Sequence, residues 1–414
     1  MKISILLPYK ENFTPDYPGA VSLFVNDTLK CSNFKNKVTV YGSTNYKNTF
    51  NHKYQNLVVN NKIFKSQNRV YVDEFLKMET RIESDLIEIH NRPIYIKYLE
   101  NKLKRNNFIL YFHNDPLSMN GSKSINERLY LINKCHKIIF NSIWSKKRFI
   151  QDLNSEDVDY ENLLVINQSA KKIKINFKKK KKLITFVGKL NKSKGYDLFG
   201  NAIIKILNKH KDWKSIVIGD EPRDKINFEH KNLSVIGFVK HNTVLNYYKS
   251  ASIAVVCSRW EEPFGRSSLE AAANGCAVII SNKGGLPETI TDGVIIDNLS
   301  VGSIYSSINE LILNYKKRIN YQKLSHKNFY LTHQYISKKI DQVRDNVIKT
   351  HKKIYLKKNN LKPRILHVTN FNERHNGRLF FNTGKRINNG FVRLGNSVLE
   401  FSDRDIQKKL QILF

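Results

Sequence analysis

The segment of this 414-residue chain that most constrains its fold holds two glutamates, Glu262 and Glu270, across a predicted strand-to-helix junction. An apolar run at residues 254–257 is typical of a short buried strand, and apolar residues from Leu269 onward recur at helical spacing. The Pro-Phe-Gly turn between them therefore opens a helix. The first N–H groups of that helix lie at the positive end of its dipole, so we predict that they bind a diphosphate.

The same segment resembles the E-x7-E signature of retaining GT-B glycosyltransferases of the family-4 type, the glycosyl transferases group 1. The likeness continues to Glu288 through a run similar to the family's EAxAxGxPVI…GGxxE pattern, with Ala277 where proline is usual. Two glutamates alone would fit a solvated surface helix, but the continuous match favours the family. The resemblance implies an α/β fold of GT-B architecture, in which two Rossmann-like domains face a central cleft.

Under this resemblance the chain moves a sugar from a nucleotide-diphosphate-sugar donor to a hydroxyl of a glycan, lipopolysaccharide or glycolipid acceptor, with retention of configuration. Glu262, one of two catalytic candidates, would hold the donor sugar, and Glu270 would bind the ribose. The residues expected to bind the donor diphosphate are Lys189, Lys194, Gly265, Arg266, Ser267 and Ser268. No metal or other cofactor is expected, because no D-x-D run lies in a suitable loop and lysines with helix dipoles can neutralise phosphates.

The two lysines follow an apolar strand that enters a glycine turn at Gly188, a place where phosphates bind. The turn is similar to the family's GRLxxxKG motif. Lys194 matches the lysine of that motif, whereas Lys189 stands where arginine is usual. This exchange keeps the charge and loses the bidentate fork of arginine. Solvated surface lysines are the alternative interpretation.

The N-terminal part alternates strands and helices like a parallel α/β unit, with strands at residues 2–8 and 37–41 and a helix from Pro18. In the resembled family the loop after the first strand carries a Gly-Gly pair that approaches the donor phosphates and the acceptor. Here the pair is Gly19-Ala20, so only Gly19 carries over as a residue of an acceptor or phosphate loop. An ordinary turn glycine is the alternative.

Two further predicted strands each end in a histidine, His90 and His113. Open α/β sheets bind their ligands at the carboxyl ends of strands, so both histidines are candidate site residues. By resemblance, His113 matches the family's active-site histidine and is the second catalytic candidate. His90 matches the DxIHxH region, whose role varies, and is grouped with the acceptor or phosphate loop. A structural hydrogen bond is the alternative for each histidine.

We expect five segments along the chain. They are an N-terminal Rossmann-like acceptor domain at 1–168, a basic linker at 169–182, a C-terminal Rossmann-like donor domain at 183–325, closing helices at 326–360, and a partial βαβ unit at 361–414. The last segment repeats the strand-loop-helix-strand order of residues 2–43. It would be either the truncated start of a further domain or an appendage that is completed by a partner.

The formal charge of +34, from 70 Lys and Arg against 36 Asp and Glu, would attract anions of any kind. The densest basic tract, Lys171–Lys182, can be a solvated linker or a contact with an anionic membrane surface. Nucleic-acid binding is not expected, because no RNA-recognition, zinc-finger or helix-turn-helix pattern accompanies the charge.

The four cysteines are scattered, and no window approaches the about 20 apolar residues of a membrane span. We therefore expect a cytoplasmic enzyme; contact of the basic tract with an anionic membrane would place it peripherally on the inner face of the cytoplasmic membrane.

Two other functions fit the same fold. The unusual residues Ala20, Lys189 and Gln168 fit a catalytically inactive GT-B scaffold that binds a nucleotide sugar or a glycan. An epimerase of sugar nucleotides would need acid and base residues that the sequence does not identify. Hydrolysis or transfer of a donor separates the enzyme from the binding protein.

Overall fold

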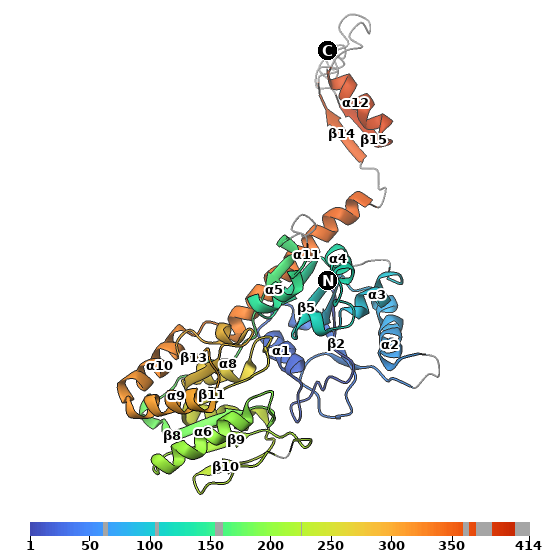
Figure 1. Cartoon of the computed structure of the whole chain (residues 1–414). Coiled ribbons are helices and arrows are strands. Elements are labelled where there is room, and N and C mark those ends of the chain that lie inside the picture. Colours follow the sequence, from blue (N-terminus) through green and yellow to red (C-terminus); the bar gives the residue numbers. More distant parts are fainter. Residues whose placement is uncertain are drawn as a thin grey trace, which may run out of the picture. The chain divides into compact units, whose positions relative to one another are not determined.

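The computed structural model describes residues 1–60, 65–103, 107–153, 160–224, 226–358, 364–369 and 383–401, with the backbone alone at 351–358. The chain divides into two compact units, Met1–Ile348 and Lys349–Phe414. The larger unit contains two parallel sheets with helices packed against them (Figure 1).

The first sheet has the strand order β3-β2-β1-β4-β5-β6-β7. Its strands are β1 Ile3–Leu6, β2 Val38–Gly42, β3 Tyr54–Asn56, β4 Leu86–His90, β5 Phe108–Phe112, β6 Lys137–Phe140 and β7 Leu163–Val165. Its helices are α1 Ala20–Leu29, α2 Gln67–Ile82, α3 Ile94–Glu100, α4 Ile125–Lys134 and α5 Ile143–Ile150. Every residue of β4 and β5 is buried, because helices cover both faces of a parallel sheet.

The second sheet has the order β10-β9-β8-β11-β12-β13. Its strands are β8 Lys181–Val187, β9 Lys214–Ile218, β10 Leu233–Val235, β11 Ala251–Val256, β12 Ala277–Ser281 and β13 Val294–Ile296. The helices after β8 are α6 Tyr196–Lys209, α7 His241–Ser250, α8 Arg266–Ala273, α9 Val301–Leu313, α10 Tyr315–Asn328 and α11 His333–Lys358. Short 3₁₀ turns occur at η1 Lys35–Lys37, η2 Pro116–Ser118, η4 Tyr160–Asn162, η5 Phe177–Lys179 and η6 Leu286–Thr289. The expected α/β architecture with two Rossmann-like sheets is confirmed.

Each sheet has a point where the chain reverses the direction in which it adds strands. In the first sheet this point lies between β1 and β4, and in the second between β8 and β11. Such switch points leave a crevice beyond the carboxyl ends of the strands, where open α/β sheets bind ligands. The topology therefore brings the loops after β4, β5, β8 and β11 into position for a binding site.

Helix α11 is attached to the first sheet through a buried ion pair. Arg344 donates two hydrogen bonds to Glu88 of β4, at 2.6 and 2.8 Å, and a third to Asp341 at 3.2 Å. The side chains of Arg344 and Glu88 are 3% and 1% exposed. Burial opposes the charge on Arg344, but Glu88 outweighs it and holds the pKa of the guanidinium above its ordinary value. Asp341 also accepts hydrogen bonds from Ser32 and Asn33, after α1.

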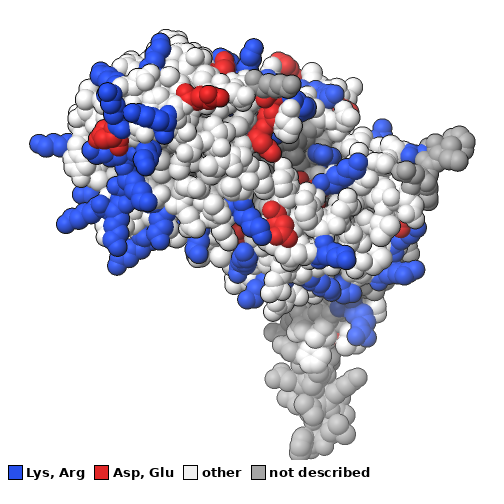
Figure 2. All heavy atoms as spheres, turned by 90° about the horizontal axis from the view of Figure 1, so that it is seen from below, with Lys and Arg blue, Asp and Glu red and all other residues white. Residues whose placement is uncertain are grey.

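The basic tract Lys171–Lys182 packs against the larger unit along part of its length. Lys172 Nζ donates to the carbonyl oxygens of Lys327 and Phe329, and Lys180 Nζ donates to those of Tyr248 and Asn274. Other lysines of the tract are exposed. Figure 2 shows Lys and Arg side chains spread over one face and dense at one end of it. Among the described residues, no helix combines the length and apolar character that a membrane span requires.

The smaller unit contains a parallel pair of strands, β14 Arg364–Val368 and β15 Ser397–Phe401, and the helix α12 Thr383–Arg393 between them. The described part of this unit has the strand-helix-strand order that the sequence predicts for its last segment. The sequence predicts the start of this helix near Leu379, and residues 379–382 lie outside the described residues.

Replacing Arg344 by methionine should lower the free energy of unfolding by about 3–5 kcal/mol, because Glu88 would remain buried without its partner. The double variant Glu88→Gln, Arg344→Met should recover most of this loss. Urea unfolding followed by circular dichroism measures both. Lys182→Met breaks the exposed pair with Asp212 and should cost at most about 1 kcal/mol. Equal losses in Arg344→Met and Lys182→Met would contradict a structural role for the buried pair.

Candidate functional site

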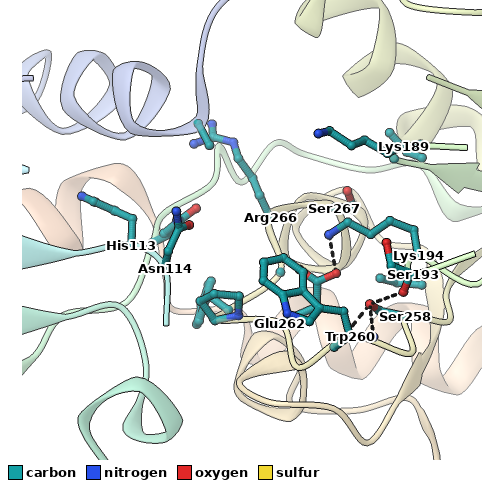
Figure 3. Close-up of a pocket in the computed structure, with 18 of the residues that line it drawn as sticks. His113, Asn114, Lys189, Ser193, Lys194, Ser258, Trp260, Glu262, Arg266 and Ser267 are labelled. Atoms are coloured by element: carbon teal, nitrogen blue, oxygen red, sulfur yellow. Dashed lines mark hydrogen bonds and ion pairs between the residues drawn. The ribbon is translucent and has the colours of Figure 1, made fainter. Parts of the chain in front are cut away.

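A pocket of about 600 Å³ lies within the larger unit, beyond the carboxyl ends of strands from both sheets (Figure 3). Five of its lining residues come from the first sheet and its loops: Ala20, His113, Asn114, Asn141 and Gln168. The second sheet and its loops contribute the sequence-predicted residues Lys189, Lys194, Glu262, Gly265, Arg266 and Ser267. Together with His113 these six make seven expected site residues, and the structure gathers them around one cavity.

The loop between β8 and α6 positions Lys194. Gly195 has φ 72°, in the left-handed region, and a Cβ at this position would collide with the carbonyl oxygen of Cys257. Only glycine fits both constraints. The side chain of Asn191 accepts hydrogen bonds from the backbone of Lys194 at 3.0 Å and from Ser193 Oγ at 2.8 Å. These contacts fix the backbone from which the Lys194 side chain enters the pocket.

The turn between β11 and α8 positions Glu262 and the start of the helix. Gly265 precedes α8 with φ 116°, and a Cβ there would meet the Leu286 side chain. The first N–H groups of α8 have no partner within the helix and lie at the positive end of its dipole. Ser268 does not line the pocket, since its hydroxyl donates to the Gly265 carbonyl oxygen and accepts from Thr289.

An ion pair between Lys194 Nζ and Glu262 Oε1 lies at the wall of the pocket (Figure 3). The two side chains are 26% and 10% exposed. The ammonium group of Lys194 also lies 5.2 Å from the centre of the Trp260 ring. The pocket wall therefore carries a paired ammonium and carboxylate group, both accessible to a ligand.

Glu270 lies outside this pocket. Its carboxylate accepts hydrogen bonds from Arg266 Nε at 2.6 Å and from His241 Nε2 at 2.8 Å. Burial opposes its ionisation, but Arg266 and His241 outweigh burial and lower the pKa of Glu270 to about 2. Arg266 extends away from Glu262 and also donates to Asp27 of α1 at 2.8 Å (Figure 3). The structure does not bring the second glutamate together with the first.

The two histidines form a buried pair. His90 Nδ1 and His113 Nε2 are 2.9 Å apart, and the ring of His90 stacks on Tyr111 with centroids at 4.4 Å. The remaining nitrogens, His90 Nε2 and His113 Nδ1, are buried without a partner among the described residues. Burial lowers the pKa of His113 to about 3 and also lowers that of His90, so both rings are neutral at pH 7. His113 lines the pocket, and His90 lies behind it.

Gly19 stands at the start of α1, outside the lining of the pocket. The space for a Cβ on Gly19 is filled by the carboxylate of Glu11, which accepts the backbone N–H of Ser22 at 3.0 Å. Burial raises the pKa of Glu11. A carboxylate of the protein therefore occupies the helix start at which the family resemblance implies a phosphate or an acceptor, and Ala20 lines the pocket instead.

The sequence patterns do not identify several residues that line the pocket. Trp260 stands two positions before Glu262, and Gln168 is a position at which the sequence departs from the family motif. Glu288, at the end of the recognised pattern, is not a lining residue; it accepts the backbone N–H groups of Ile143 at 2.8 Å and Trp144 at 3.0 Å. It thereby links η6 of the second sheet to the start of α5. Within the described ranges, no group of three or more His, Cys, Asp or Glu side chains could hold a metal ion.

Residues 167–327 match the family model described as Glycosyl transferases group 1. Over 364 residues the chain is 25% identical to Spore coat protein SA of Bacillus subtilis, covering 78% of this chain and 93% of the relative. It is 33% identical over 180 residues to an uncharacterized glycosyltransferase, MJ1607, of Methanocaldococcus jannaschii, covering 37% and 46%. A third relative is the lipopolysaccharide core biosynthesis mannosyltransferase LpsB of Rhizobium meliloti, 30% identical over 123 residues, covering 27% and 35%.

Solved structures share the fold at low sequence identity. The Anabaena protein Alr3699/HepE, in complex with UDP-glucose, superposes with a TM-score of 0.63 at 16% identity, covering 83% of this chain and 99% of that one. Sucrose-phosphate synthase from Thermosynechococcus elongatus gives a TM-score of 0.68 at 14% identity, covering 84% and 100%. These likenesses confirm the expected architecture of two facing Rossmann-like halves.

Because the pKa of Glu270 is low, we predict that this residue affects how the free energy of unfolding changes at acid pH. Because its folded pKa lies below the ordinary value of 4.5, at about 2, its ionisation contributes about 3 kcal/mol at neutral pH. That contribution is lost as pH falls through the range from about 5 to about 2. Glu270→Gln should therefore show a shallower decrease in unfolding free energy between about pH 5 and about pH 3.

Urea titrations at several pH values measure this slope. Glu310→Gln removes a carboxylate whose side chain is 49% exposed and should keep the wild-type slope. If Glu270→Gln and the wild type lost stability in parallel, the ion pairs of Glu270 would not hold its carboxylate ionised.

Proposed function

The chain belongs to the group 1 glycosyltransferases with the GT-B fold, and on this premise we propose that it transfers a sugar from a nucleotide-diphosphate-sugar donor to an acceptor hydroxyl. We include retention of configuration and independence of a metal ion in the proposal. The observation that carries it is the Lys194–Glu262 ion pair beside the start of α8, in one pocket lined by both sheets.

The leaving group of such a transfer is a nucleoside diphosphate, on which negative charge develops as the bond to the sugar breaks. Lys194, Lys189 and the N–H groups at the start of α8 line the same pocket and are positive. Fixed positive groups of this kind stabilise developing charge without having to reorganise. In our proposal they take the place that a metal ion holds in other transferases.

Glu262 accepts hydrogen bonds from hydroxyl groups of the donor sugar in this scheme. In the structure its carboxylate is paired with Lys194. Donor binding separates the two groups, since the ammonium moves to a phosphate and the carboxylate to hydroxyls. Each charge thereby exchanges one partner for another, so that neither is left unpaired in the partly buried pocket.

Two other expected site residues can bind the donor or the acceptor only after they leave their present partners. His113 can contact the sugar or the acceptor only if its ring leaves His90, because both ring nitrogens are buried. Glu270 can bind the ribose only if it exchanges Arg266 or His241 for hydroxyl groups. Ser268 serves the turn before α8. His90 and Gly19 do not line the pocket. In our proposal His90 positions the ring of His113, and Gly19 leaves room for the carboxylate of Glu11.

For the acceptor we propose a glycan, a lipopolysaccharide or a glycolipid. The name of the Rhizobium relative, a lipopolysaccharide core mannosyltransferase, supports an envelope glycan. The exposed lysines of the tract Lys171–Lys182 support peripheral contact with an anionic membrane surface on the cytoplasmic side.

A second candidate is a catalytically inactive scaffold that binds a nucleotide sugar. Two observations favour it: Ala20 lines the pocket where the family has a glycine, and the polar atoms of His113 are buried. A donor that raises the melting temperature without being hydrolysed or transferred would favour this candidate.

Lys194→Ala and Glu262→Ala should each lower transfer about 100-fold or more without unfolding the protein, because each removes a charge that the proposed reaction uses. Release of nucleoside diphosphate from UDP-, GDP- and ADP-sugars measures the reaction, and thermal melts measure folding. Lys192→Ala removes an exposed lysine of the same loop that does not line the pocket and should keep activity. Wild-type turnover in either site variant would remove this assignment.

A further inference from the structure

Trp260 is a large aromatic side chain that the proposed reaction leaves without a role. The chain has three tryptophans. Trp213 is buried in the second sheet's core at 3% exposure, whereas Trp260 is 47% exposed and lines the pocket. Exposed aromatic surface costs free energy in water, at roughly 25 cal/mol per Å². An indole left open inside a binding pocket therefore favours a ligand that covers it.

The backbone of Trp260 is fixed before any ligand arrives. Its N–H is shared between the carbonyl oxygen of Ser193 and the hydroxyl of Ser258, both at 3.2 Å. Ser258 Oγ in turn lies 3.1 Å from the carbonyl oxygen of Trp260 and 3.2 Å from that of Ser193. The loops after β8 and β11 thus hold the residue jointly. A platform that is ordered in advance loses little conformational entropy when a ligand binds.

The indole lies beside the ion pair of the pocket. Lys194 Nζ is 5.2 Å from the ring centre, within the range of a cation–π contact, and it also binds Glu262 (Figure 3). The ammonium group therefore marks the place of a donor phosphate, and the ring and the carboxylate beside it are placed for the group that this phosphate carries. When the ammonium binds a phosphate, the ring next to it becomes free for the group attached to that phosphate.

We propose that Trp260 is the platform for the donor's sugar ring and a determinant of sugar specificity. This inference rests on the proposed function and extends it by one subsite. A pyranose has a face of C–H groups and a rim of hydroxyls. The C–H face covers the apolar indole, while hydroxyls at the rim reach the carboxylate of Glu262.

The chemistry of the neighbours favours the sugar over the nucleobase. In a nucleotide sugar the sugar is bonded directly to the terminal phosphate, whereas the base is separated from it by the ribose and both phosphates. A ring 5.2 Å from the ammonium that binds a phosphate therefore lies within reach of the sugar. A carboxylate two residues along the chain also suits hydroxyl donors.

The experiment compares UDP with UDP-glucose on the full chain, by calorimetry and by tryptophan fluorescence. If the wild type prefers another base, the same comparison is made between GDP and GDP-glucose or between ADP and ADP-glucose. Trp260→Ala should lower the affinity for the sugar nucleotide about tenfold, or about 1.4 kcal/mol. It should lower the affinity for the nucleoside diphosphate by less than about threefold. Trp260→Phe keeps a flat ring and should restore most of the difference. The sugar nucleotide should quench wild-type fluorescence more than the diphosphate does.

Tyr330→Ala removes a side chain that is 50% exposed outside the pocket and serves as the matched control for both ligands. Equal losses for UDP and UDP-glucose in Trp260→Ala would place the base on the ring and overturn the inference. Unchanged affinity for both would overturn it as well. A wild type that binds none of the nucleotide sugars would instead overturn the proposed function, so the two failures are distinguishable.

Discussion

The ion pair between Lys194 and Glu262 is the interaction on which the site depends. Its partners are 68 positions apart and come from the loops after β8 and β11. These strands are neighbours in a parallel sheet, so their carboxyl ends deliver both loops to one edge. An isolated carboxylate or ammonium at this depth would be costly, and pairing removes most of that cost. The pocket can therefore hold two opposite charges that suit two different parts of a donor.

Other charged contacts join the halves of the larger unit around this pair. Arg266 connects α8 to Asp27 of α1, and Glu288 accepts two N–H groups at the start of α5. Polar contacts of this kind are specific in geometry and can exchange for a ligand or water, unlike a continuous apolar interface. They suit a cleft whose two walls must both contact a ligand and then release a product.

The sequence alone predicts some of the local contacts and does not identify others. The strand-turn-helix around Glu262 follows from apolar periodicity and from the glycine before α8. Arg266 and Glu270 are spaced i,i+4 on that helix, a spacing that predicts an ion pair, whereas the family resemblance implies a ribose-binding role for Glu270. Trp260 carried no signal, because an aromatic residue beside a strand usually belongs to the core.

By itself the sequence determined the elements, the parallel α/β class and the loops that face the pocket, because periodicity, glycine turns and strand ends are properties of neighbouring residues. Only the tertiary structure decided which charges and rings meet. Glu11 fills the space beside Gly19, His90 pairs with the ring of His113, and Arg344 neutralises Glu88 from 256 positions away. Such partners are selected by packing and by the cost of burying an unpaired polar group, which depend on distances in space rather than along the chain.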